Sequence, residues 1–163
     1  MAKQNTPTPE LSVIVPVLNE AAELPAFLAD VRRQQQVNFE LILVDGGSSD
    51  GTCELLQQEQ IRVFTSQRGR GHQLNAGAAL AQGPWLLFLH VDSRFSDPLA
   101  WRKGIDFLAG RGAGRVAGHF ALNFITGSAH QGRGYDFYER KARSSMLETI
   151  HGDQGFLLHR SLH

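Results

Sequence analysis

The chain has 163 residues, enough for one domain with a hydrophobic core of its own. Hydrophobic residues make up 42% of the sequence and charged residues 20%, which is typical of a soluble globular protein. Sixteen basic residues balance 16 acidic ones, so no overall positive field would attract nucleic acid. An anionic ligand would therefore have to be held by local groups.

Residues 1–10 are expected to form a flexible tail. They are polar, carry Pro7 and Pro9, and lack the apolar core of a signal peptide. The longest apolar run, Trp85–Leu89, is too short to cross a bilayer. These features predict a cytoplasmic protein.

Residues 11–90 alternate between expected strands and helices. The strands are predicted at Leu11–Val17, Phe39–Val44, Ile61–Thr65 and Trp85–His90. The helices are predicted around Pro25, where Leu24, Phe27, Leu28 and Val31 form an apolar stripe, and at Thr52–Gln60 and His72–Ala81. This alternation through short loops predicts an α/β fold with a mostly parallel sheet covered on both faces.

The pattern changes after Pro98. A helix, a segment of alternating apolar and polar residues, a glycine-rich loop, a second helix and a last strand are expected in turn. They are predicted at Leu99–Leu108, Val116–Phe124, Thr126–Gly134, Tyr135–Met146 and Gly155–His159. No internal repeat or low-complexity linker divides the sequence, so residues 11–163 are expected to form a single domain.

Three polar clusters follow expected strands: Asn19-Glu20, Asp45–Asp50 and His90–Ser93. Ligands of such sheets bind outside the carboxyl ends of the strands, so the convergence of the clusters favours a binding site. In the second cluster, the Asp45 carboxylate could accept hydrogen bonds from a base or ribose, and the glycines would let backbone approach the ligand. An ordinary surface turn would use the same residue types.

His90 and Asp92 are alternate residues, so an extended chain places them on the same side. A carboxylate beside an imidazole can hold a divalent cation against a diphosphate, and Mg²⁺ and Mn²⁺ often take only one or two carboxylates plus phosphate oxygens. For Asp92 this interpretation is favoured over a turn or cap role. His90 could equally bond to backbone.

Basic residues precede the helix expected at His72. Arg68 and Arg70 could pair with phosphate oxygens, helped by the partial positive charge of the helix N-terminus. A solvated basic loop is the alternative. The single cysteine, Cys53, excludes an internal disulfide and is expected to pack or cap rather than to react.

The order and spacing of three motifs resemble the family 2 inverting glycosyltransferases of the GT-A fold. The motifs are Ser12–Glu20, Val44–Thr52 and the strand ending at His90–Asp92, and the resemblance covers most of residues 11–160. A later motif, Gly152–Gly155 with His159-Arg160, is similar to a small bacterial branch named for arsenosugar biosynthesis. The resemblance implies a Rossmann-like GT-A sheet with helices on both faces.

The resemblance also implies roles for individual residues. Pro16 and Glu20 would border the nucleoside of a nucleotide-sugar, and Asp45 would bond its base or ribose. Asp92 matches the metal-binding carboxylate of the Asp-x-Asp motif, and His90 stands where that motif usually has its first Asp. The implied donor-binding residues are thus Pro16, Glu20, Asp45, Arg70 and His90, with Asp92 as the ligand of a Mn²⁺ or Mg²⁺ cofactor.

The chain departs from the family pattern at two places. Gly46 stands where a second Asp is common, which leaves Asp45 as the main acidic contact there. The Glu-Asp motif that usually follows the last expected strand, and whose carboxylate deprotonates the acceptor, does not occur before His163. The C-terminal part is therefore expected to be incomplete, and Asp153 is the fallback catalytic base.

The function expected from these observations is transfer of a sugar, with inversion, from a nucleoside-diphosphate-sugar such as a UDP-sugar to an unidentified acceptor. The alternative is a catalytically inactive nucleotide-sugar-binding fragment. A dinucleotide-dependent oxidoreductase is disfavoured, because Pro16–Glu20 has no glycine fingerprint after the first strand. Further partner predictions are a peripheral membrane contact and, if a sheet face stays uncovered, a homo-oligomer.

Overall fold

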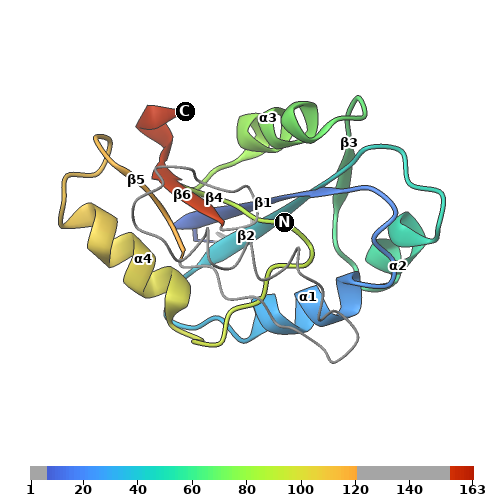
Figure 1. The fold of residues 1–163 in the computed structure, drawn as a ribbon, viewed down its shortest axis with the longest axis horizontal. Helices are drawn as coiled ribbons and strands as arrows, with labels where there is room; N and C mark the ends of the chain where they lie inside the picture. Colours follow the sequence, from blue (N-terminus) through green and yellow to red (C-terminus); the bar gives the residue numbers. More distant parts are fainter. Residues whose placement is uncertain (1–6, 121–154) are drawn as a thin grey trace, which may run out of the picture.

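The computed structural model describes residues 7–120 and 155–163 of the chain. These residues form a six-stranded sheet in the order β3-β2-β1-β4-β6-β5, with helices packed against it (Figure 1). The strands are β1 Leu11–Val17, β2 Phe39–Asp45, β3 Val63–Thr65, β4 Trp85–Phe88, β5 Ala117–His119 and β6 Phe156–His159. The helices are α1 Leu24–Arg32, α2 Thr52–Gln58, α3 Arg70–Leu80 and α4 Ala100–Ala109, with a short 3-10 helix η2 at Arg160–Leu162.

The sheet is mostly parallel, as predicted. β1 pairs in parallel with β2 on one side and with β4 on the other, and β3 extends the sheet in parallel beyond β2. β6 runs antiparallel between β4 and β5. The strands expected from the alternating pattern of the first 90 residues therefore make up the parallel part.

Helices cover both faces of the sheet, which confirms the expected α/β architecture. Along β1, Val13 and Val15 point into the core formed with α1, α2 and α4. Ile14 points to the other face, where Ala78 of α3 packs. Figure 1 shows α3 on one side of the strands and the other three helices on the opposite side. The period of two along a buried strand thus explains why β1 is apolar throughout.

Helix α3 packs unusually close to the sheet because Gly77 faces it. A Cβ atom on Gly77 would come within 2.5 Å of Ile14 Cγ2 and 3.2 Å of Val44 Cγ2. Real Cβ atoms do not approach other atoms so closely, so only glycine allows this spacing. The close contact brings the polar side chains of α3 within reach of the strand backbones.

The observed bounds differ from the predicted ones at several ends. α3 begins at Arg70, two residues earlier than expected, and β4 ends at Phe88 rather than at His90. β3 starts at Val63, and only Ala117–His119 of the alternating segment forms a described strand. The glycine-rich loop and the helix predicted at residues 126–146 lie outside the described residues.

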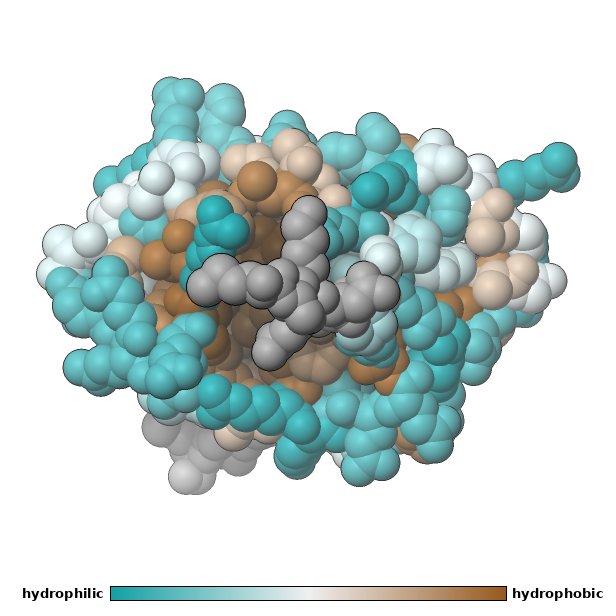
Figure 2. Space-filling model, turned by 180° about the vertical axis from the view of Figure 1, so that it is seen from behind, coloured by the Kyte–Doolittle hydropathy of each residue, from teal (hydrophilic) through white to brown (hydrophobic). Residues whose placement is uncertain are grey.

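The surface of the described part is largely polar. Seen from behind, hydrophilic residues cover most of the molecule, and apolar residues gather in a hollow near the centre of this face (Figure 2). None of the helices described is both long and apolar enough to cross a membrane.

Candidate functional site

A crevice opens where β1 and β4 separate. β4 pairs with β1 only along Leu11–Ile14, and the last backbone bond between them runs from Leu89 N to Ile14 O at 3.0 Å. β1 continues with β2 as far as Val17. Since α1 and α3 lie on opposite faces, this is a topological switch point, the place where open α/β sheets bind ligands.

Pro16 lies in β1 at this separation. Proline has no backbone N–H and is normally excluded from central strands. Here the ladder to β4 has already ended at Ile14, while Pro16 remains in register with Val44 of β2. The missing donor therefore costs no ladder hydrogen bond to β4, and Pro16 lies in β1 beyond the point where β4 separates.

The loop after β1 is joined to the loop after β2 by several hydrogen bonds. Asn19 has a φ of 58°. Its side-chain oxygen accepts a hydrogen bond from Ser49 N at 2.9 Å, and its own N–H donates to Ser48 Oγ at 2.9 Å. Glu20 N donates to Thr52 Oγ1 at 2.8 Å. The two polar clusters predicted to converge therefore form one connected wall of the crevice.

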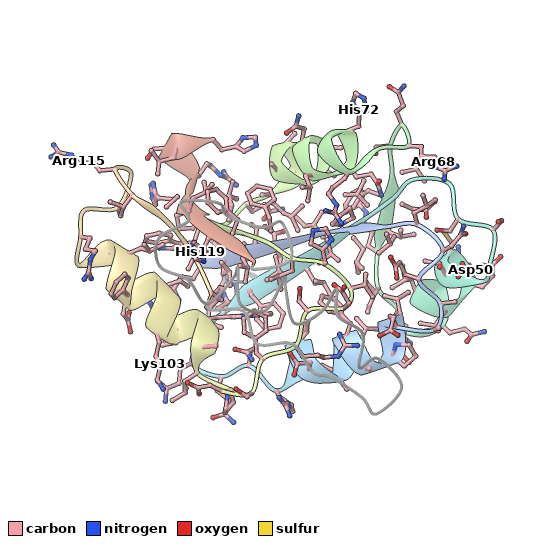
Figure 3. All side chains as sticks on the ribbon, in the orientation of Figure 1. Asp50, Arg68, His72, Lys103, Arg115 and His119 are labelled. Carbon is pink, nitrogen blue, oxygen red and sulfur yellow. The ribbon has the colours of Figure 1, made fainter. Side chains whose placement is uncertain are left out.

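Asp50 strengthens the same wall. Its Oδ1 accepts the Thr52 hydroxyl at 2.5 Å, and its Oδ2 accepts Ala21 N at 3.0 Å. The hydrogen bond from the Thr52 hydroxyl is the largest cause that lowers the pKa of Asp50. Figure 3 shows Asp50 and Arg68 at one end of the sheet and Arg115 at the other.

Asp45 is buried at the end of β2 and is engaged by its own loop. Its carboxylate accepts Gly47 N at 2.8 Å, Ser48 N at 3.1 Å and Ser48 Oγ at 2.5 Å. This is the geometry of an Asx turn, in which the side chain shapes the following loop. A carboxylate has about four acceptor positions, so a contact to a nucleoside would use the capacity that remains.

Two carboxylates of the loops after β1 and β4 influence each other electrostatically. Burial raises the pKa of Glu20, and the negative charges of Asp92, Glu23 and Asp50 raise it further. Asp92 itself is exposed, in the loop that follows β4. The strand ends thus place Glu20 and Asp92 near enough for their charges to repel.

Arg70 and His90 meet on the other side of the crevice. The first residue of α3 places the Arg70 guanidinium 3.1 Å from His90 Nδ1. A guanidinium can only donate, so in this contact His90 Nδ1 is the acceptor. His90 thus pairs with a cationic side chain at the position where the family motif usually has an Asp.

The described residues contain no preformed metal cage. Among residues 7–120 and 155–163, no group of three or more His, Cys, Asp or Glu side chains could hold a metal ion. The exposed carboxylate of Asp92, with Glu20 close enough to repel it, fits a divalent cation held partly by a phosphorylated ligand. A cation there would also relieve the repulsion.

Gln73 is the site residue that the sequence analysis missed. Its side chain is buried, and Nε2 donates to Val17 O at 2.8 Å and to Val44 O at 2.7 Å. It therefore joins the carboxyl ends of β1 and β2 to α3. The sequence feature that could have revealed Gln73 is its position on the helix face that also carries Gly77 and Ala78.

Gly46 is explained by the same side chain. A Cβ atom at position 46 would lie 3.1 Å from the carboxamide carbon of Gln73. The second Asp that is common there would require Gln73 to move. The glycine at position 46 and the placement of the Gln73 side chain are therefore coupled.

The remaining candidates have less to do with the crevice. Burial and the nearby charge of Asp45 raise the pKa of Cys53, so its thiol stays protonated, in agreement with a packing role. Trp101 is fully buried in the core, with its ring edge-on to Phe39 and Phe95. Asp153 lies outside the described residues.

An apolar cavity of about 360 Å³ lies elsewhere, between α4 and the strands β5 and β6. Phe107, Leu108 and Leu157 line it, and Lys103 and His119, labelled in Figure 3, stand among its lining residues. No carboxylate of the described residues lines this cavity. It does not share the polar strand ends of the crevice.

Relatives and solved structures agree with this arrangement. The chain is 43% identical over 91 residues to a PGL/p-HBAD biosynthesis glycosyltransferase of Mycobacterium bovis, covering 52% of this chain and 36% of that protein. It is 30% identical over 152 residues to glycosyltransferase AglE of Haloferax volcanii, covering 87% of this chain and 48% of the relative. The chain thus spans about half or less of the length of these relatives.

Two solved structures share the fold. One is the mannosyltransferase PcManGT from Pyrobaculum calidifontis in complex with GDP-Man and Mn²⁺, with a TM-score of 0.67 and 22% identity over 97% of this chain and 46% of that one. The other is S. aureus TarS 1-349 in complex with UDP-GlcNAc, with a TM-score of 0.62 and 21% identity over 72% of this chain and 36% of that one. Both similarities concern the fold.

The family of the chain is identified from its sequence. The model of "Glycosyl transferase family 2" matches residues 12–161, which include every strand of the sheet except the first residue of β1. The chain belongs to glycosyl transferase family 2.

Proposed function

We propose that this chain binds a nucleoside-diphosphate-sugar in the crevice between β1 and β4 and transfers the sugar, with inversion, to an acceptor that is still to be identified. The family membership supports transfer of a sugar, and the crevice supports the donor site. The observation that carries the proposal is that groups of opposite charge gather at the strand ends. Glu20 and Asp92 supply carboxylates, the acidic side, and the Arg70 guanidinium, in contact with His90, supplies the positive charge of the basic side.

The basic side suits the diphosphate. The Arg70 guanidinium is exposed and always charged, and a planar guanidinium binds phosphate oxygens well. His90 contacts this guanidinium through Nδ1. Arg70, with His90 beside it, would bind the phosphate oxygens of the donor and hold the leaving group in place.

The acidic side suits a divalent cation. Asp92 would hold Mn²⁺ or Mg²⁺ together with phosphate oxygens, as these ions are commonly held in phosphate-binding enzymes. When bound, the ion supplies charge neutralisation for the departing nucleoside diphosphate. GDP-Man with Mn²⁺ and UDP-GlcNAc are the donors named for the two solved structures, and we propose a UDP-sugar here.

The wall formed by the β1 and β2 loops would bind the nucleoside. Pro16 and Glu20 border the crevice, and the buried Asp45 would accept a hydrogen bond from the base or ribose. The joined loops keep this wall in place by hydrogen bonds that the side chains of Asn19 and Asp50 accept from backbone N–H groups. The nucleoside would thus lie on the side of the crevice nearest β2.

Deprotonation of the acceptor is assigned to Asp153 as a prediction. A base that removes the proton of the acceptor hydroxyl allows its oxygen to attack the anomeric carbon in line with the leaving group, which inverts that centre. The arsenosugar-biosynthesis branch, a cytoplasmic location, a peripheral membrane contact and self-association also stay predictions.

Calorimetric titration with UDP, UDP-glucose and GDP-mannose, each with and without Mn²⁺, tests the donor site. We expect binding that requires Mn²⁺ and that falls at least tenfold in Asp92→Ala and in Asp45→Ala, because each change removes a charged partner. Equal affinity in wild type and both variants would overturn the assignment. A thermal unfolding curve of each variant shows that it remains folded.

A second measurement distinguishes a transferase from a chain that only binds the donor. Incubation with a radiolabelled UDP-sugar and a panel of acceptors would yield a labelled product if the chain is a transferase. Donor binding with slow hydrolysis and no product on any acceptor would instead favour the inactive binding fragment.

A further inference from the structure

Two hydrogen bonds join the side chain of Gln73, a helix residue, to the sheet. Gln73 is 3% exposed, and its amide nitrogen uses both protons on strand-end carbonyls, those of Val17 and Val44. Buried carbonyl groups need donors; Val17 O also accepts Gly46 N at 3.0 Å, and the side chain of Gln73 donates to both strand-end carbonyls. The bonds connect helix and sheet at one fixed spacing.

The same end of α3 carries the basic side of the crevice. Arg70 and Gln73 are three residues apart, so they lie on adjacent turns of the helix and their positions are coupled through it. α3 has no side-chain N-cap, and Gly69 before it has a φ of 137°. Among the described contacts of this first helical turn, the Gln73 amide is therefore the main connection to β1 and β2.

We infer that Gln73 is a positioning residue for the nucleotide-sugar site. By holding the first turn of α3 against the ends of β1 and β2, it sets the distance between the Arg70 guanidinium and the nucleoside wall that carries Asp45. Gly46 belongs to the same arrangement, because a Cβ at this position would lie 3.1 Å from the carboxamide and would require it to shift. The inference rests on the proposed function, since it assigns Gln73 to the donor that Arg70 binds.

A double-mutant cycle with Arg70 tests this role. The probe is UDP with Mn²⁺, titrated calorimetrically into the full chain. Gln73→Met keeps the length of the side chain and removes the donor, so we expect UDP affinity to fall about tenfold. Arg70→Met should weaken binding by a similar factor. In the Arg70→Met background, adding Gln73→Met should change the affinity less than twofold, because Gln73 acts through Arg70.

A matched control separates positioning from stability. Gln34 is also a buried glutamine, and it bonds Asp97 O and Trp101 N, neither of which belongs to the nucleotide-sugar site proposed above. Gln34→Met should lower the unfolding temperature while leaving UDP affinity within twofold of wild type. If Gln73→Met unfolds the chain, Gly46→Ala displaces the carboxamide more mildly and should show the same dependence on Arg70.

The outcomes are distinct. An equal loss of affinity on adding Gln73→Met, or Gly46→Ala, to wild type and to Arg70→Met would overturn the positioning role and leave the donor site standing. Unchanged UDP affinity in a folded Gln73→Met would overturn it as well. No binding of UDP by folded wild type would overturn the proposed function, and this inference with it.

Discussion

The two ends of the sheet both contain polar networks, but only one network is closed. At the amino end, the Ser12 hydroxyl donates to Glu40 Oε1 at 2.6 Å and accepts Gly83 N at 2.9 Å, and Glu40 Oε1 also accepts Gln82 N at 2.6 Å. At the carboxyl end, loops are joined in the same manner, yet Asp92 and Arg70 remain exposed.

The difference separates structural from ligand-binding polar groups. A network whose donors and acceptors are all satisfied within the protein contributes to stability and has little left to offer a ligand. A network that leaves opposite charges exposed on two sides of a crevice offers them to a ligand. Changes at the amino end should therefore alter stability alone, and changes at the carboxyl end should alter binding.

The largest effect is expected from Gly83→Ala at the amino end. The added Cβ would lie 2.9 Å from backbone atoms of Leu11 and Ser12, which cannot move aside without disturbing β1. We expect the free energy of unfolding, measured with urea, to fall by about 3 kcal/mol. Gly71→Ala is the control, because its Cβ meets nothing within 4 Å on a helix and should raise stability by about 0.5–1 kcal/mol. Equal stability of the two variants would contradict the packing described.

Glu40→Met should give the next largest effect. It removes an acceptor shared by three donors and leaves the buried Ser12 hydroxyl without its acceptor, which costs about 2 kcal/mol of unfolding free energy. UDP affinity of the folded variant should stay within twofold of wild type. A tenfold loss of affinity would show that the two ends of the sheet are coupled and would break the comparison.

Asn19 tests the loops at the carboxyl end. Asn19→Ala loses the bond from Ser49 N and puts Ala, which tolerates the left-handed region less well than Asn, at a φ of 58°, for a combined cost of about 1.5 kcal/mol. Asn19→Gly loses only the bond, and should cost about 1 kcal/mol or less. Both should weaken UDP binding, because the nucleoside wall loosens. The comparison would fail if Asn19→Ala lowered stability and left binding intact.

The smallest effect concerns pH. The pKa of Asp50 is lowered in the folded chain, chiefly by the Thr52 hydroxyl, so its charged form favours folding. This contribution is complete above the ordinary carboxyl pKa of about 3.9 and is lost as the pH falls through the lower folded value. The unfolding temperatures of wild type and Asp50→Asn should therefore differ at pH 7 and converge toward pH 3. A difference that grows on acidification would contradict the hydrogen bonding of Asp50.

Much of the fold could be predicted from local sequence patterns. Strand β1 and the stripe of α1 were placed correctly, because a buried parallel strand is apolar throughout and a covering helix repeats its apolar residues every three or four positions. The end of β4 could not be placed, because His90 and Leu89 continue an apolar run after the pairing with β1 has ended. Strand ends depend on the neighbouring strand, which local patterns do not show.

The site could be predicted less completely. The polar clusters at Asn19-Glu20, Asp45 and His90–Asp92 were expected to converge, and they lie at the carboxyl ends of β1, β2 and β4. The contact of Arg70 with His90 and the bonds of Gln73 were not expected. Both depend on how close α3 lies to the sheet, which Gly77 permits, and the importance of Gly77 appears only once the opposing Ile14 is known.

The most direct test of the donor site is paramagnetic broadening in ¹⁵N-labelled protein. On adding Mn²⁺ with UDP, we expect the backbone amide signals of Glu20, Gly47 and Asp92 to broaden, while those of Ser12, Glu40 and Gly83 at the amino end stay sharp. UDP with Mg²⁺ is the diamagnetic control. Broadening confined to the amino end, or to Lys103 and His119 beside the apolar cavity, would contradict a metal-nucleotide site in the crevice.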